Sequence, residues 1–437
     1  MTQRNKYLNA FIAVTSLFFM WGLITVLVDS LIPRLKEIFE LNNFQAALVQ
    51  FAFFTAYGLV SIPAGKFLSK IGYKKGMLVG LATMGVGCLM FWPAASLRIF
   101  PVFMLGYFIL ASGMTVLQVA ANPYVSVLGP EESASSRLNL SQAFNSLGTA
   151  IAPIIGANFI LSDSILSSDQ IGQLVESDRL NYFAQEASAV SGPFIVLAMC
   201  LLGLAGVVAF FKLPQVLGSQ PGGGYFDVIK NNKLMLGALG IFLYVGAEVA
   251  IGSFLVNYFV DMGMPDIVRE NGFMASVADK LLKDPLGQVD NKGIVGAFVL
   301  FYWSGAMVGR FIGSVIMKFI SAKKLLAIFG LLAISMVLIS MATTGLISMW
   351  SILAVGLFNS IMFPTIFTIG IEDLGDQKPL GSGILCTAIC GGAFIPLAYG
   401  ALADGIGYKM AFIMPILCYL YIAYYGFKYS NQKAIVS

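Results

Sequence analysis

Three charged residues lie within long apolar stretches of this 437-residue sequence: Asp29, Glu248 and Arg310. A charge near the centre of a membrane helix costs about 2.5–3.5 kcal/mol. Such residues therefore usually face the interior of a helix bundle or a watery cavity, where they mark routes for ions or substrates. The chain contains no histidine. A proton carried inside the membrane would have to sit on a carboxylate, which makes Asp29 and Glu248 candidate cation-coupling residues.

Each charge also has a purely structural interpretation. Asp29 lies four residues before Pro33 and could sit at the outer membrane interface, and Arg310 could pair with a carbonyl at a helix end. An interfacial position is harder to arrange for Glu248, which lies fifteen residues after Lys233.

Uncharged amides form a second group. Gln118 and Asn122 are four residues apart, and Gln142 and Asn145 are three apart, so each pair shares one face of a helix. Amides offer hydrogen-bond donors and acceptors, as sugar hydroxyls do, although they can also bond one membrane helix to another. An aromatic ring can stack on a sugar. The predicted substrate-binding residues are Trp21, Gln118, Asn122, Gln142, Asn145, Glu248 and Asn359.

The elements that must position these residues are membrane helices. The chain is 58% hydrophobic and 11% charged, whereas soluble domains contain about 25% charged residues. Continuous apolar runs of about 20 residues recur along it, each long enough to cross a bilayer as a helix, and they lack the alternation of a β-barrel. We expect an all-α polytopic membrane protein with twelve spans: 8–33, 44–68, 76–95, 100–127, 138–161, 191–213, 233–260, 293–317, 323–344, 347–370, 380–402 and 408–427.

Lys and Arg favour cytoplasmic loops. In this sequence they concentrate in segments that are inner if the N-terminus is inside, such as Lys74, Lys75, Lys323 and Lys324. We therefore expect both termini in the cytoplasm. The net charge of +4 mostly reflects these basic residues of the inner loops, and it does not indicate nucleic-acid binding.

The sequence also predicts two pseudo-symmetric six-helix bundles. "GKFLSKIGYKKG" (65–76) is echoed half a chain later by "GSVIMKFISAKK" (313–324). Parallel repeats of this kind build the two halves of major facilitator transporters. The polar, glycine-rich segment between them reads as a linker. The predicted domains are therefore 1–213, a cytoplasmic linker 214–232, and 233–437.

The loop between the second and third spans resembles the major facilitator gating signature, in which Gly65, Lys70, Gly72, Lys74 and Lys75 occupy matching positions. Where the signature usually has an aspartate, this chain has Ser69. We assign Arg310, in the corresponding span of the second half, to the same gate. Plain retention of basic residues on the inner side is the alternative interpretation.

Five longer stretches carry a wider resemblance: "SLFFMWGLITVLVDSLIP" (16–33), "FQAALVQFAFFTAYGLVSIPAGKFLSKIGYKKG" (44–76), "LQVAANPYVSVLGP" (117–130), "RLNLSQAFNSLG" (137–148) and "FPTIFTIGIEDLG" (363–375). They resemble the fucose permease and glucose/galactose transporter family of major facilitators. In this resemblance Asp29 matches the helix 1 aspartate of the proton-coupled fucose permeases, whereas Gln118 stands where their helix 4 glutamate would be, as in the sodium-coupled glucose/galactose branch. Glu248 supplies an acid where the fucose pattern has an amide.

The resemblance implies a monomeric hexose symporter of the bacterial inner membrane, with the lipid bilayer as its surroundings. Its coupling ion would be Na⁺ or H⁺, and it would need no other cofactor. With Na⁺, Asp29 would be a direct ligand, Thr25 and Gln118 would add neutral oxygens, and glucose or galactose would be the substrate. With H⁺, Asp29 or Glu248 would carry the proton.

Other functional classes predict different residues. An intramembrane enzyme would need a nucleophile with a base, and the chain has neither histidine nor a Gly-x-Ser-x-Gly elbow. A lipid or drug carrier would have a mostly apolar cavity, unlike the amide-rich spans here. A membrane sugar receptor that does not transport would keep the same binding residues, so it stays open as an alternative.

Overall fold

The computed structural model describes residues 3–29, 43–159, 173–216, 223–282 and 284–430, and every regular element among them is a helix. The first long helices are α1 (Gln3–Asp29), α3 (Asn43–Ile71), α4 (Tyr73–Leu97), α5 (Phe100–Val127), α6 (Ala134–Phe159) and α8 (Glu176–Phe210). The later ones are α10 (Asn232–Asp261), α13 (Asn291–Ile316), α14 (Ala322–Ala342), α15 (Gly345–Asn359), α16 (Met362–Ile371), α17 (Lys378–Thr387), α18 (Gly391–Ile406) and α20 (Ile413–Ser430). Short helices are α9 (Tyr225–Val228), α11 (Met264–Glu270), α12 (Gly272–Leu281), α19 (Tyr408–Ala411), η1 (Glu131–Ser133), η2 (Leu286–Gln288), η3 (Glu372–Gln377) and η4 (Ala388–Cys390).

Ten stretches of the described residues are long and apolar enough to cross a membrane. They include a helix for every predicted span except 138–161, where the polar side chains of α6 lower its hydropathy. Two predicted spans fall in one stretch, Gly345–Ile406, because only the short segment η3, with Gly375 at a φ of 49°, separates α16 from α17. Every predicted span therefore contains a helix.

The chain forms two compact units. Unit 1 comprises residues 1–134, 144–231 and 371–387, and unit 2 comprises 135–143, 232–370 and 388–437. The start of α6 thus belongs to unit 2, and α17 belongs to unit 1. The predicted division into two six-helix halves stays a prediction.

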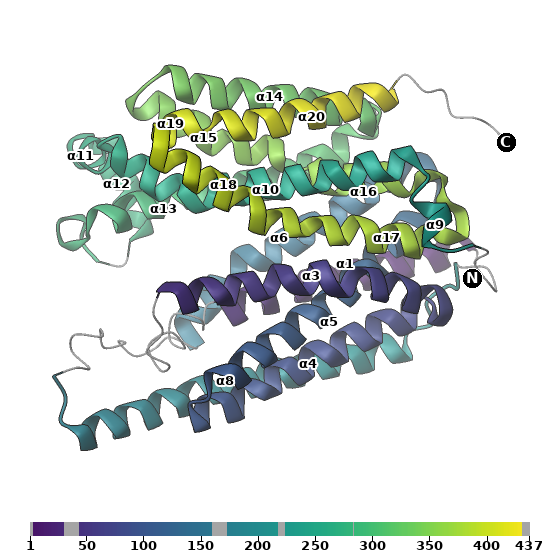
Figure 1. Ribbon diagram of the computed structural model, residues 1–437, viewed down its shortest axis with the longest axis horizontal. Helices are drawn as coiled ribbons and strands as arrows, with labels where there is room; N and C mark the ends of the chain where they lie inside the picture. Colours follow the sequence, from purple (N-terminus) through teal and green to yellow (C-terminus); the bar gives the residue numbers. More distant parts are fainter. Residues whose placement is uncertain (1–2, 30–42, 160–172, 217–222, 283, 431–437) are drawn as a thin grey trace. The chain divides into compact units, whose positions relative to one another are not determined.

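In unit 1, α4 lies against both α5 and α8 (Figure 1). Glycines bring the backbones of α4 and α5 together. A Cβ atom on Gly80 would lie 2.8 Å from the main-chain nitrogen of Leu117, and one on Gly113 would lie 2.5 Å from that of Met84. Small residues allow membrane helices to approach this closely, so this surface is a tight packing face.

In unit 2, α10 packs against α13, α18 and α20, while α14 packs against α15 and α20; Figure 1 shows α14 beside α20. Helices α13 and α15 cross closely because both carry glycines at the contact. A Cβ on Gly356 would overlap the main chain of Tyr302, and one on Gly309 would overlap the carbonyl oxygen of Leu357. This crossing holds Tyr302 directly beside α15.

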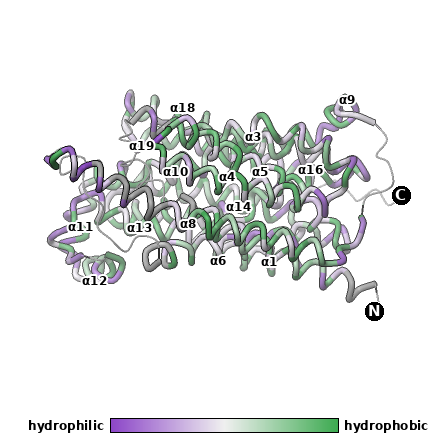
Figure 2. The backbone as a smooth tube through the Cα atoms, turned by 90° about the horizontal axis from the view of Figure 1, so that it is seen from below, coloured by the Kyte–Doolittle hydropathy of each residue, from purple (hydrophilic) through white to green (hydrophobic). Residues whose placement is uncertain are grey.

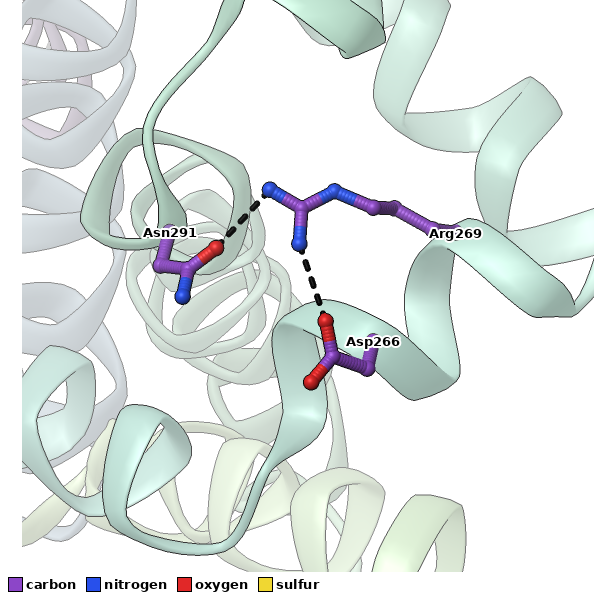
Figure 3. A network of polar contacts seen from close by, with 3 residues as sticks. All are labelled: Asp266, Arg269 and Asn291. Carbon is purple, nitrogen blue, oxygen red and sulfur yellow. Dashed lines mark hydrogen bonds and ion pairs between the residues drawn. The ribbon is translucent and has the colours of Figure 1, made fainter.

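Hydrophilic residues gather at the ends of the long apolar helices and in the segments that join them, as around α11 (Figure 2). Arg269 of α11 donates to Asp266 Oδ1 at 3.0 Å and to Asn291 Oδ1 at 2.8 Å (Figure 3). Because Asn291 begins α13, the network ties α11 to that helix. The Asp266 side chain is 74% exposed, so its ion pair contributes at most about 1 kcal/mol.

Candidate functional site

Helix α1 carries Trp21, Thr25 and Asp29 at intervals of one turn. The Trp21 ring is buried and lies 5.5 Å from the ring of Phe18. The Thr25 hydroxyl donates to the carbonyl of Trp21 at 2.8 Å, so its oxygen keeps lone pairs for another ligand. Asp29 is the last residue of α1, and its side chain lies outside the described part of the structure.

On α5, Gln118 is half-buried and Asn122, one turn later, is fully buried. The Gln118 side-chain nitrogen donates to the hydroxyl of Tyr57 at 2.7 Å, which connects α5 to α3. Gln118 is therefore the more accessible member of this pair, with its amide nitrogen already held in place.

On α6, the Asn145 amide nitrogen donates to the carbonyl of Phe18 at 2.9 Å. Glycines make this contact with α1 possible, because a Cβ on Gly22 would overlap the main chain of Asn145 and one on Gly148 would overlap that of α1. Gln142, three residues earlier, is buried. In this arrangement the Asn145 nitrogen bonds one helix to another, and its oxygen is the atom left for a solute.

In unit 2, four side chains form what we name the Glu248 cluster: Tyr244, Glu248, Tyr302 and Asn359. The Tyr244 hydroxyl donates to Glu248 Oε1 at 2.8 Å. The Tyr302 hydroxyl donates to the main-chain carbonyl of Glu248 at 3.3 Å and accepts from the Asn359 amide at 2.7 Å. The structure thus brings two predicted site residues, Glu248 and Asn359, into one hydrogen-bonded group from three helices.

Arg310 lies next to this cluster and caps a break between α15 and α16. Its Nε donates to the carbonyl of Ser360 at 3.2 Å. That carbonyl has lost its helical partner, because the residue four positions later is Pro364, which has no N–H. Arg310 therefore makes the helix-end contact considered above as its structural interpretation.

The same arrangement recurs in unit 1. Pro123 leaves the carbonyl of Val119 in α5 without a helical donor. The Ser382 hydroxyl of α17 donates to this oxygen at 2.9 Å. A proline in each unit thus creates an acceptor that a side chain of another helix satisfies.

The loop that resembles the gating signature has mostly local contacts. Gly72 joins α3 to α4 with a φ of 81°, a conformation that favours glycine. Ser69, at the position of the usual aspartate, donates its hydroxyl to a carbonyl of its own helix. Lys74 donates to the carbonyl of Ala209 at 2.8 Å, near the C-terminal end of α8, where a positive charge is favourable. The other basic residues of the motif are exposed: Lys70 and Lys75.

Gly65 of the same motif lies where α3 meets α17. A Cβ on Gly65 would lie 3.3 Å from the Cα of Gly383 and 2.6 Å from the hydroxyl of Tyr225. Tyr225, from α9 in the predicted linker, donates to the carbonyl of Ile62. Burial raises the pKa of Tyr225 to about 12, so the hydroxyl keeps its proton at neutral pH.

Replacing Tyr225 by Phe should weaken the docking of α9 on α3. The loss of this hydrogen bond is expected to destabilise unit 1 by about 0.5–1.5 kcal/mol and to speed tryptic cleavage at the exposed Lys230. Tyr421→Phe is the matched control, because this tyrosine also donates to a helix carbonyl, that of Leu236, at 2.9 Å. Cleavage at Lys230 that is equally fast in both variants would contradict the assignment.

Sequence reasoning did not identify Tyr57, Tyr225 or Ser382 as partners of the functional helices. Their contacts join residues far apart in the sequence, and no local spacing reports them. Tyr244 is different, because it lies one turn before Glu248 on the same helix, and this spacing could have indicated the contact.

Comparison with known proteins extends over almost the whole chain. A sequence model described as the Major Facilitator Superfamily matches residues 10–395. The glucose/galactose transporter of Brucella abortus biovar 1 (strain 9-941) is 47% identical over 430 residues, which cover 97% of this chain and 95% of that protein. The L-fucose-proton symporter of Escherichia coli (strain K12) is 32% identical over 442 residues, which cover 99% of this chain and 95% of the relative.

Among solved structures, a crystal structure of the major facilitator transporter FucP in the outward conformation matches with a TM-score of 0.86 and 30% identity, over 98% of this chain and all of that one (100%). These matches confirm the predicted resemblance and the predicted all-helical fold class. The matched relatives are transporters, and the chain is accordingly a multi-pass membrane transporter and not an enzyme. The chain belongs to the major facilitator superfamily.

Proposed function

We propose that this transporter takes up a hexose together with a cation by alternating access. The observation that carries the proposal is the 47% identity to a glucose/galactose transporter over 97% of the chain. The polar side chains support it, because amides and a carboxylate hydrogen-bond hydroxyls well and here occupy otherwise apolar helices. The proposed sugar ligands are Trp21, Gln118, Asn122, Gln142, Asn145, Glu248 and Asn359.

For the coupling ion we propose sodium, bound by Asp29 with help from Thr25 and Gln118. Sodium is a hard cation that binds oxygen ligands. The Thr25 hydroxyl and the Gln118 amide each donate within the protein, which directs their hydrogens away and leaves oxygen lone pairs for a cation. Glu248 is the second carboxylate available for coupling.

Proton coupling is the second candidate, favoured by the 32% identity to an L-fucose-proton symporter. In that scheme Asp29 or Glu248 would bind the proton outside and release it inside. Gln118 could not take part, because an amide does not ionise near neutral pH.

Purified protein in liposomes distinguishes these schemes. We expect uptake of labelled glucose or galactose to be driven by an imposed sodium gradient at equal pH on both sides. Uptake that responds only to a pH gradient would mean that the coupling ion is a proton and not sodium. Binding of hexose without exchange across the vesicle membrane would instead make the protein a sugar receptor.

We further propose a monomer in the bacterial inner membrane with both termini in the cytoplasm, as the distribution of Lys and Arg favours. Gating would then involve Gly65, Lys70, Gly72, Lys74, Lys75 and Arg310 on the cytoplasmic side. The tight contact of Gly65 with α17 and the capping contact of Arg310 support roles in helix docking.

A further inference from the structure

The positions of the hydrogens in the Glu248 cluster follow from its contacts. A tyrosine hydroxyl has one hydrogen to donate. Tyr302 donates it to the main-chain carbonyl of Glu248, so its oxygen must accept from the Asn359 amide. Tyr244 donates its hydrogen to Glu248 Oε1. Both tyrosine hydrogens are therefore committed within the cluster.

The second carboxylate oxygen of Glu248, Oε2, differs from Oε1 in its hydrogen bonding. Among the described residues no side chain donates a hydrogen bond to it, and Glu248 is only half-buried. Asn359 Oδ1, on the other side of Tyr302, is fully buried and has no hydrogen-bond partner in the described structure. Two acceptors thus remain at the cluster, and both are oriented by hydrogen bonds made by other atoms of the same side chains.

We infer that Glu248 Oε2 accepts a hydrogen bond from one hydroxyl of the transported hexose, and that Tyr244, which holds Oε1, positions the carboxylate for this contact. The inference rests on the proposed function and deepens it. A carboxylate can only accept at this point, so the substrate must donate a hydrogen there. Recognition would depend on the hydrogen of that hydroxyl and not on its oxygen.

This chemistry can be tested with sugar analogues. A deoxy hexose lacks the hydroxyl, and a fluorodeoxy hexose has a fluorine that cannot donate. When the modified position is the hydroxyl that bonds Glu248, we expect both analogues to compete with labelled hexose about 10- to 100-fold less well than the parent sugar. At positions read by groups that donate to the sugar, the fluoro analogue should bind better than the deoxy analogue.

Two variants assign the effect to the cluster. The glutamine of Glu248→Gln can donate as well as accept. In this variant the analogues modified at that position should compete to within about threefold of the parent sugar, while competition by analogues modified elsewhere stays unchanged. Tyr244→Phe removes the hydroxyl that holds Oε1, so it should reduce the same positional loss and raise KM more than it lowers the maximal rate. It also keeps the test available if the glutamate variant does not fold.

Tyr258→Phe is the matched control. Tyr258 is also a buried tyrosine of unit 2, on α10, and bonds the hydroxyls of Ser340 and Ser348 rather than the Glu248 cluster. In this variant each sugar analogue should compete with labelled hexose as well as it does in the wild type. The inference would be overturned if the weaker competition at that position persisted unchanged in both Glu248→Gln and Tyr244→Phe. It would also be overturned if these variants lost cation coupling alone. Absence of any hexose uptake by the wild type would overturn the proposed function instead.

Discussion

Asp29→Asn is expected to abolish concentrative hexose uptake. The substitution removes the charge at the end of α1 while keeping the size of the side chain, so in the proposed scheme the cation would lose the carboxylate that binds it together with Thr25 and Gln118. Sodium coupling needs this carboxylate in the proposed scheme, and proton coupling needs it where Asp29 rather than Glu248 carries the proton, since an amide neither neutralises sodium nor carries a proton. The measurement is accumulation of labelled hexose in vesicles under an imposed sodium or pH gradient.

A defect in sugar binding could imitate a loss of coupling, and counterflow separates the two. In counterflow, unlabelled sugar inside the vesicles drives entry of labelled sugar with no cation gradient. We expect Asp29→Asn to retain at least part of this exchange. Concentrative uptake that survives the substitution would show that the coupling carboxylate lies elsewhere, with Glu248 the next candidate.

Gly356→Val is expected to prevent stable folding of unit 2. Even a Cβ at this position would overlap the main chain of Tyr302, and valine adds two methyl groups. The two helices would have to separate, which would displace Asn359 from Tyr302 and dismantle the Glu248 cluster. Overpacking typically reduces folding stability by about 1–3 kcal/mol. Because the clash here is with backbone and not with a movable side chain, we expect a loss at the upper end of this range.

The readouts are the yield of monodisperse protein in detergent and its thermal unfolding. Gly296→Ala on α13 is the matched control, because the nearest atom to a Cβ there is a side-chain carbon of Val256 at 3.9 Å. Removing a helical glycine should leave that variant as stable as the wild type or slightly more stable. Wild-type stability in Gly356→Val would mean that α13 and α15 do not pack as described.

The fold was largely predictable because hydropathy reports burial in a membrane directly. The exception is instructive. α6 carries Gln142 and Asn145 on faces turned toward other helices, and those side chains lower its hydropathy without preventing a helix. The interruption of the tenth predicted span at Ser360 was also only partly predictable, since Pro364 indicates a lost hydrogen bond but not the length of the break.

The candidate site was predictable residue by residue, but not as a set of contacts. Charged and amide side chains stand out in apolar sequence, so Glu248 and Asn359 could be selected from composition alone. Their connection through Tyr302 could not, because it depends on how closely α13 approaches α15. Tyrosines are too frequent in this chain, with 17 of them, for any one to be singled out by type.

The two prolines described above have a consequence for motion. Pro123 and Pro364 each leave a carbonyl that no N–H of its own helix can reclaim, and Ser382 or Arg310 occupies it instead. When such a side chain withdraws, water can take its place and the helix does not unwind. Each proline therefore gives its helix an acceptor that a side chain of another helix or a water molecule can occupy, so that exchanging one for the other replaces a single hydrogen bond.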